Sequence, residues 1–168
     1  MSSWTRGGSD TIRRAHAVHP ISVLQSEYSI FARDVEPLLP VLGELGIGFV
    51  AYSPLARGFL SGAAKSRDHY AADDFRQRIA WWNSENFDAN IAIANELTKL
   101  AESKGATLSQ LALAWLLAKK DYIVPIPGSR NPGRVAQNIA AAGLTLTAED
   151  LAHITEIVPD GGIGGRLS

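Results

Sequence analysis

The sequence has no cysteine, so disulfides, thiolate metal sites and a cysteine nucleophile are all excluded. This absence is typical of a reducing compartment, and we expect a cytoplasmic protein. The sequence also has no excess of either charge, because sixteen basic and seventeen acidic residues give a formal net charge of −1. Binding of a nucleic acid or an anionic membrane would call for a broad basic surface. Neither is therefore expected as a partner.

Long hydrophobic runs are missing as well. The longest purely apolar run, 111–118, is far shorter than the ~20 residues that span a bilayer. Residues 1–14 lack the apolar core of a secretory signal. The composition, with 46% hydrophobic and 20% charged residues, is that of a globular domain. The 168 residues fit one domain, 1–168, whereas a complete (β/α)₈ barrel takes about 250 residues.

Short apolar runs alternate along the chain with longer segments of helical periodicity. The pattern predicts strands at 21–26, 48–53 and 122–125. It predicts helices at 10–17, 35–45, 87–104, 108–119, 132–142 and 148–158. Such alternation is typical of an α/β fold with a parallel sheet. Residues 1–9 are expected to be irregular or a vestigial strand, and residues 159–168 an irregular tail.

Residues with strong capping preferences mark several of these helix boundaries. Side chains that can accept a free N–H of the first turn stand before four of the helices. These predicted caps are Ser9, Thr107 (which forms a capping box with Gln110), Asn131 and Thr147. Gly46 is placed to end helix 35–45, and Pro132 takes a first helical position, where its missing N–H does no harm.

A long polar stretch, 58–86, follows the second strand. Loops of this length in compact domains are usually functional or disordered. The tryptophans, Trp4, Trp81, Trp82 and Trp115, form no regular aromatic platform and are assigned to packing or loop anchoring.

Two further patterns are set aside. His16 and His19 have no third ligand and are interpreted as surface histidines, so no metal site is predicted. The glycine run 161–165 follows a helix, which is the wrong context for a dinucleotide loop.

The segment from Pro127 to Arg134 is the most informative one. A strand ends, a Gly-Ser turn follows, and the next helix begins with free N–H groups and the positive end of its dipole, which together suit an anion. Arg130, Arg134 and Asn138 fall four residues apart and can line one face. Two guanidinium groups favour a phosphate over a carboxylate. The alternative is a solvated helix start with two surface arginines, and spacing alone does not decide between the two.

Two other strand ends carry candidate ligand groups. Tyr52 could stack on a flat ring, while Ser53 and the glycine-bearing loop after it could meet phosphate oxygens. Gln25 offers both a donor and an acceptor, which suits an amide. Taken alone, each residue is better explained as part of the packing or backbone capping at the end of a strand.

These segments together resemble the aldo-keto reductase family. The matching motifs are QSEYS, VAYSPLARGFLSG, ENF with its long helix, SQLALAWLLA and PIPGSRNPGRVAQNIAA, and they extend over about residues 10–165. The resemblance implies a (β/α)₈ barrel of oxidoreductases that binds NADP(H) without a Rossmann fold and reduces aldehydes and ketones.

The resemblance also implies a role for each candidate residue. Gln25 would hydrogen-bond the nicotinamide carboxamide, and Tyr52 would stack on the nicotinamide ring. The pyrophosphate would be surrounded by Ser53, Leu55, Arg57 and Gly58. The adenosine 2′-phosphate would be held by Gly128, Ser129, Arg130 and Arg134, with Gln137 and Asn138 near the adenine. Many relatives have lysine in place of Gly128, so the affinity would depend more on the two arginines.

The matched motifs correspond to the second half of the family barrel, from about its fifth helix onward. We therefore expect a partial (β/α)₈ TIM barrel with parallel strands and an additional C-terminal helix. The family's catalytic Asp, Tyr, Lys and His belong to the first half, and no residue of this sequence matches those motifs, so none is predicted to be catalytic.

We accordingly expect a chain that binds NADP(H) and is inactive alone. Two alternatives stay open, namely an enzyme that is active only in complex with a chain supplying the first half, and a truncated fragment without function. Free strand edges and an uncovered interior face would favour a homo-oligomer or a complementary half-barrel chain as partner.

Overall fold

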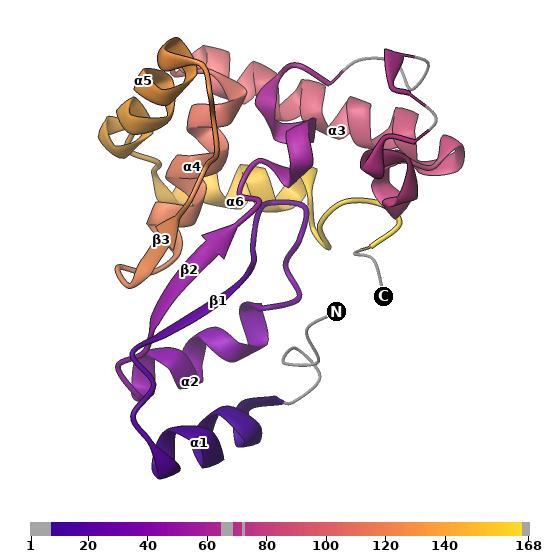
Figure 1. The fold of residues 1–168 in the computed structure, drawn as a ribbon. Helices are drawn as coiled ribbons and strands as arrows, with labels where there is room; N and C mark the ends of the chain where they lie inside the picture. The colour runs from indigo at the N-terminus through magenta and orange to yellow at the C-terminus, as the bar shows by residue number, and fades with distance from the viewer. Residues whose placement is uncertain (1–7, 65–68, 72, 166–168) are drawn as a thin grey trace.

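Three short parallel strands form the sheet of the computed structural model, which describes residues 8–64, 69–71 and 73–165 (Figure 1). The strands are β1 (Val23–Glu27), β2 (Gly48–Tyr52) and β3 (Ile123–Pro125), in the order β1-β2-β3. Glu27 pairs with Tyr52, and Ala51 pairs with Pro125, so all three strands end at the same edge. The predicted parallel α/β fold is confirmed.

Six α-helices accompany the sheet in the described part of the chain. They are α1 (Gly8–Val18), α2 (Leu39–Glu44), α3 (Ser84–Ser103), α4 (Leu108–Lys119), α5 (Pro132–Ala140) and α6 (Ala148–Ile157). In Figure 1, α1 and α2 lie below the strands and α3 to α6 lie above them. None of these helices combines the length and apolar character needed to cross a bilayer.

Three of the predicted caps are present. Thr107 and Gln110 form a reciprocal capping box at the start of α4, and Thr147 forms one with Asp150 at the start of α6. The Asn131 side chain accepts a hydrogen bond from the Arg134 N–H at 3.1 Å. These caps satisfy N–H groups that a helix start otherwise leaves free. Ser9 is an exception, because α1 begins at Gly8 and Ser9 lies within its first turn.

The predicted helix 35–45 is divided in the structure. Residues Glu36–Leu38 form a 3₁₀ turn and α2 begins only at Leu39, because Pro37 and Pro40 each lack the N–H that a continuous helix needs. Its end is as predicted: Gly46 adopts a left-handed φ of 65°, and the Ile47 N–H donates to the Leu42 carbonyl. Helix 132–142 is also shorter than predicted, since α5 gives way to a 3₁₀ turn at Ala141–Gly143.

The stretch 58–86 is anchored by aromatic packing and is not a bare polar loop. It contains the short 3₁₀ helices Phe75–Arg78 and Ala80–Trp82. Trp81 and Trp82 are fully buried, and the Trp82 ring packs against Phe59 with their centroids 4.3 Å apart. Burying large aromatic side chains contributes strongly to stability. The assignment of Trp81, Trp82 and Trp115 to packing is confirmed, whereas Trp4 lies outside the described residues.

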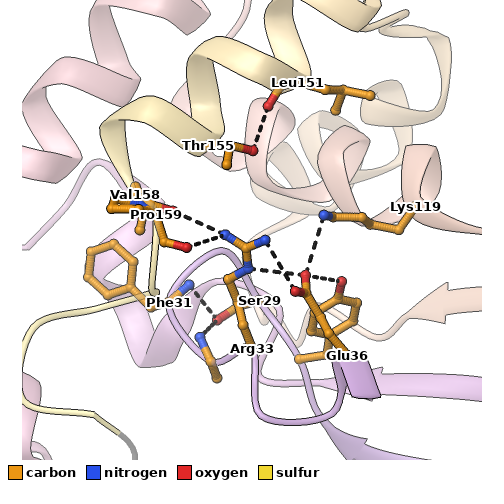
Figure 2. Close-up of polar contacts among 11 residues, drawn as sticks. Ser29, Phe31, Arg33, Glu36, Lys119, Leu151, Thr155, Val158 and Pro159 are labelled. Atoms are coloured by element: carbon orange, nitrogen blue, oxygen red, sulfur yellow. Dashed lines mark hydrogen bonds and ion pairs between the residues drawn. The ribbon is translucent and has the colours of Figure 1, made fainter. Parts of the chain in front are cut away.

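Arg33 and Glu36 together join three parts of the chain that are distant in sequence (Figure 2). Arg33, in the loop after β1, donates two hydrogen bonds to the Glu36 carboxylate at 3.0 and 3.1 Å. It also donates to the carbonyls of Val158 and Pro159 beyond α6, while Lys119 at the end of α4 pairs with Glu36 at 3.3 Å. Burial opposes ionisation of Glu36 and would raise its pKa, but the hydrogen bonds from Arg33 and Tyr28 and the positive charges of Lys119 and Arg33 together outweigh it, so the pKa is lowered.

The glycine-rich segment after α6 is packed into the core. The Gly162 N–H donates to the Phe31 carbonyl at 2.9 Å. Asn90 of α3 is fully buried, donates to the Ile163 carbonyl at 2.9 Å and accepts from its N–H at 2.8 Å. Gly161 has a left-handed φ of 90°, and a Cβ there would lie 2.5 Å from the Phe31 carbonyl oxygen. The segment has neither helix nor strand, but close approach of neighbouring atoms requires glycine at 161, 162 and 164.

Replacing Gly161 with alanine should lower the free energy of unfolding by about 2 kcal/mol, because backbone strain adds to the steric clash. Urea denaturation followed by circular dichroism measures the change. Gly143→Ala is the matched control, since a Cβ at Gly143 meets nothing within 4 Å. Equal unfolding midpoints for the two variants would show that the packing of Gly161 contributes nothing to stability.

Candidate functional site

A groove of about 1050 Å³ opens at the edge where β2 and β3 end. One wall is the turn that follows β2, and a second is the connection from β3 into α5. The third wall comes from the stretch 58–86 and includes Tyr70 and Arg76. The carboxyl ends of parallel strands are where α/β proteins place their ligands. The groove is thus the candidate site.

The structure brings most of the predicted site residues together in this groove. Ten of the twelve line it: Ser53, Leu55, Arg57, Gly58, Gly128, Ser129, Arg130, Arg134, Gln137 and Asn138. Gln25 and Tyr52 lie apart from it on the sheet. Gln25 pairs with Val50 and is exposed, while Tyr52 is half-buried beside Glu27. Residues paired across parallel strands share a face, so Gln25 and Tyr52 lie on the same side of the sheet.

The turn after β2 has an unusual backbone. Ser53, Ala56 and Arg57 all have left-handed φ values, of 50°, 48° and 54°. The Ala56 N–H donates to the Ser53 carbonyl at 2.9 Å, and the Gly58 N–H donates to the Leu55 carbonyl at 3.0 Å. Residues other than glycine adopt this conformation at a cost, and such residues cluster at ligand sites. The strain makes this turn a candidate part of a ligand site.

The wall formed by α5 is organised by short-range hydrogen bonds. The Ser129 hydroxyl accepts from the Asn131 N–H at 3.1 Å, and Asn131 in turn caps the helix through the Arg134 N–H. Arg130 precedes the helix, and Arg134 lies in its first turn. The positive end of the α5 dipole and two guanidinium groups therefore meet at one end of the groove.

The charge of the groove is of one sign. Four arginines line it, Arg57, Arg76, Arg130 and Arg134, and none of its described lining residues is Asp or Glu. Two carboxylates pair with these arginines from outside the lining: Glu27 with Arg57 at 3.1 Å, and Asp74 with Arg76 at 2.6 Å. A groove with this lining favours an anion with several negative groups.

Sequence reasoning missed the third wall of the groove. The Arg76 guanidinium stacks 4.0 Å from the centre of the Tyr70 ring and hydrogen-bonds Asp74 through two nitrogens, at 2.9 and 2.6 Å. These hydrogen bonds and the backbone N–H of Arg76 lower the pKa of Asp74 to about 2. An Asp two residues before an Arg in a polar stretch was the available signal, but it did not reveal which wall the pair would form.

No metal centre is seen in the part of the chain that the structure describes, since no three His, Asp or Glu side chains gather there. His16 has a structural contact, because its Nδ1 accepts a hydrogen bond from the Ile21 N–H at 3.1 Å. The described lining of the groove offers hydrogen-bond donors and arginines.

A parallel α/β sheet with a ligand groove at its carboxyl edge is the arrangement found in segments of α/β barrels. A sequence model of the Aldo/keto reductase family matches residues 5–159. The chain belongs to that family.

Two curated relatives are also members of the aldo-keto reductase family. The chain is 40% identical over 158 residues to Aldo-keto reductase str7 of Strobilurus tenacellus, covering 92% of this chain and 47% of the relative. It is 42% identical over 157 residues to Probable aldo-keto reductase 1 of Glycine max, covering 93% and 45%. The chain thus spans about half the length of the curated relatives it matches.

Two solved structures show the same fold. A glycerol dehydrogenase from Gluconobacter oxydans superposes with a TM-score of 0.84 at 24% identity, over 95% of this chain and 48% of that one. An aldo-keto reductase from Klebsiella pneumoniae, solved in complex with NADPH, superposes with a TM-score of 0.63 at 25% identity, over 95% and 47%. The three parallel strands therefore align with half of a barrel.

Replacing Arg76 with methionine should raise the pKa of Asp74 from about 2 toward its ordinary value, because the hydrogen bonds that favour the carboxylate are lost. With Arg76 present, ionised Asp74 stabilises the fold above about pH 4, and this contribution is lost as the pH falls through 2. Carboxyl NMR titration measures the shift. Asp150, whose pKa is lowered mainly by Lys104, is the internal control and should not move.

Proposed function

We propose that this chain is the cofactor-binding half of an aldo/keto reductase barrel and that it binds NADP(H). The observation that carries the proposal is the groove with four arginines and no described carboxylate in its lining. NADP(H) has three phosphate groups, at the pyrophosphate and the ribose 2′ position, and so requires donors along its whole length. The groove offers them at both ends and along the Arg76 wall.

The two ends of the groove suit different phosphates. The strained turn of Ser53, Leu55, Arg57 and Gly58 would hold the pyrophosphate, since its backbone and one guanidinium face the groove. Ser129, Arg130 and Arg134 at the start of α5 would hold the 2′-phosphate, with Gly128 allowing close approach of the backbone. Gln137 and Asn138, one turn further along α5, would lie near the adenine.

The nicotinamide end would extend onto the sheet. Gln25, in the middle of β1, and Tyr52, the last residue of β2, share a face of the sheet, so an amide and an aromatic ring lie on the same side. Gln25 can hydrogen-bond the carboxamide as donor and acceptor, and Tyr52 can pack against the ring.

The proposed function stops at binding. Bound NADPH supplies a hydride, and the carbonyl also needs a proton from a positioned acid, which raises rates by roughly 10²–10⁴-fold. We assign no residue of this chain to that role, because none matches the family's catalytic Asp, Tyr, Lys and His motifs. The chain's own residues bind and orient the cofactor.

NADPH should bind the chain saturably and more tightly than NADH, and Arg134→Met should weaken NADPH binding by at least tenfold while changing NADH binding little. The reason is that only NADPH offers the 2′-phosphate to a charged donor. Isothermal titration calorimetry measures both affinities. Arg14→Met removes an exposed charge on α1 and is the matched control. An absence of saturable NADPH binding by the unsubstituted chain would contradict the proposed function.

A second candidate function is that of one partner in a two-chain reductase, and an uncovered sheet face favours it. Val23, Val124 and Ile126 are 53%, 56% and 46% exposed beside the strands. On the described residues, β1 and β3 each pair with a strand on one side only. An exposed apolar face next to open strand edges favours association. A chain supplying the remaining strands would cover both and contribute the acid.

Mixing this chain with a separately produced first half of the Strobilurus tenacellus relative should then restore NADPH-dependent reduction of an aromatic aldehyde. Val124→Lys should reduce that activity by tenfold or more, because it places a charge in the apolar contact. Val18→Lys, at an 88% exposed position on α1, should not. Absorbance at the NADPH wavelength measures turnover, and light scattering measures complex formation. Equal activity of the two variants would argue against this face as the contact.

A further inference from the structure

Glu27 is a buried acid to which neither the groove lining nor the proposed cofactor contacts give a role. It is the last residue of β1 and is 3% exposed. It pairs in register with Tyr52, the last residue of β2, so it lies at the strand edge directly beneath the turn that follows β2. A carboxylate so far removed from water is costly unless it is paired.

Arg57 is a partner of this acid. Its Nη2 lies 3.1 Å from Glu27 Oε2, although the two residues are 30 positions apart in the chain. The Arg57 guanidinium also lies 5.0 Å from the centre of the Phe75 ring, and its side chain is 26% exposed. The arginine therefore reaches from the groove down to the end of β1 and joins the turn to the sheet.

The Arg57–Glu27 contact lies in a turn whose backbone conformation is strained. Ala56 and Arg57 are consecutive left-handed residues, and Gly58 after them has a φ of 109°. A conformation of this kind persists only when surrounding contacts hold it. Within the turn, the Ala56 and Gly58 N–H groups each make a local hydrogen bond, whereas the Arg57–Glu27 pair links the turn to a neighbouring strand.

We propose that Glu27 is a positioning residue for the anion site: it fixes the Arg57 guanidinium and the turn 53–58 in the arrangement that receives the pyrophosphate. Glu27 does not line the groove, and the proposed effect is assigned to its contact with Arg57, which does. This inference rests on the proposed binding of NADP(H). It adds a residue outside the groove whose effect on affinity is transmitted by an arginine of the lining.

The test is a double-mutant cycle on NADPH affinity, measured by calorimetry. Glu27→Gln keeps the side-chain shape but removes the charge, and should raise the dissociation constant about tenfold, because a charge-assisted hydrogen bond no longer orders Arg57. Arg57→Met should weaken binding at least as much. The double variant should bind within twofold of Arg57→Met alone, because the Glu27–Arg57 contact is already absent from Arg57→Met.

Glu36→Gln is the matched control. It removes another carboxylate paired with an arginine, Arg33, remote from the groove lining. It should lower the melting temperature and leave the NADPH affinity unchanged. Melting curves for every variant show that the fold is retained. A merely structural role of Glu27 would weaken binding by the same factor with and without Arg57.

Each outcome decides one question. Non-additive effects in the cycle support positioning by Glu27. Multiplicative effects, or unchanged affinity in Glu27→Gln while the unsubstituted chain binds NADPH, overturn this inference and leave the proposed function intact. No NADPH binding by the unsubstituted chain overturns both.

Discussion

Parallel pairing of three short strands is the constraint on which the rest of the structure depends. Parallel neighbours cannot be joined by tight hairpins, so each strand is followed by a crossover that returns the chain to the opposite edge. All three strands therefore end together, and the segments that follow β2 and β3 meet although they are about 75 residues apart. The groove exists because of this meeting.

The positive and negative side chains at the groove occupy different positions. Its arginines face the ligand space, and the carboxylates that pair with two of them lie behind, Glu27 under Arg57 and Asp74 beside Arg76. Each carboxylate pairs with a guanidinium and stays outside the described lining, so positive charge is concentrated at the groove of a protein whose net charge is close to zero. Such an arrangement suits the anion of the proposed function.

A different part of the molecule carries the contacts that hold segments distant in sequence together. Arg33 ties the loop after β1 to the residues beyond α6, and the glycine segment that follows packs against Phe31 and Asn90. The sheet face with Val23 and Val124 is instead exposed. These contacts join the loop after β1, helix α3 and the residues beyond α6, and they lie away from the exposed face of the sheet.

The sequence by itself determined the strands, most helix boundaries and the two motifs around Ser53 and Arg130, because caps, turns and periodicity depend on residues a few positions apart. Ten of the twelve residues singled out from these motifs line the groove, and their role in binding stays a prediction. Only the tertiary structure decided that Arg76 forms a third wall, that Glu27 holds Arg57, and that Gly161 packs on Phe31. Those contacts join residues brought together by the fold, and no local pattern encodes which distant side chain will be the partner.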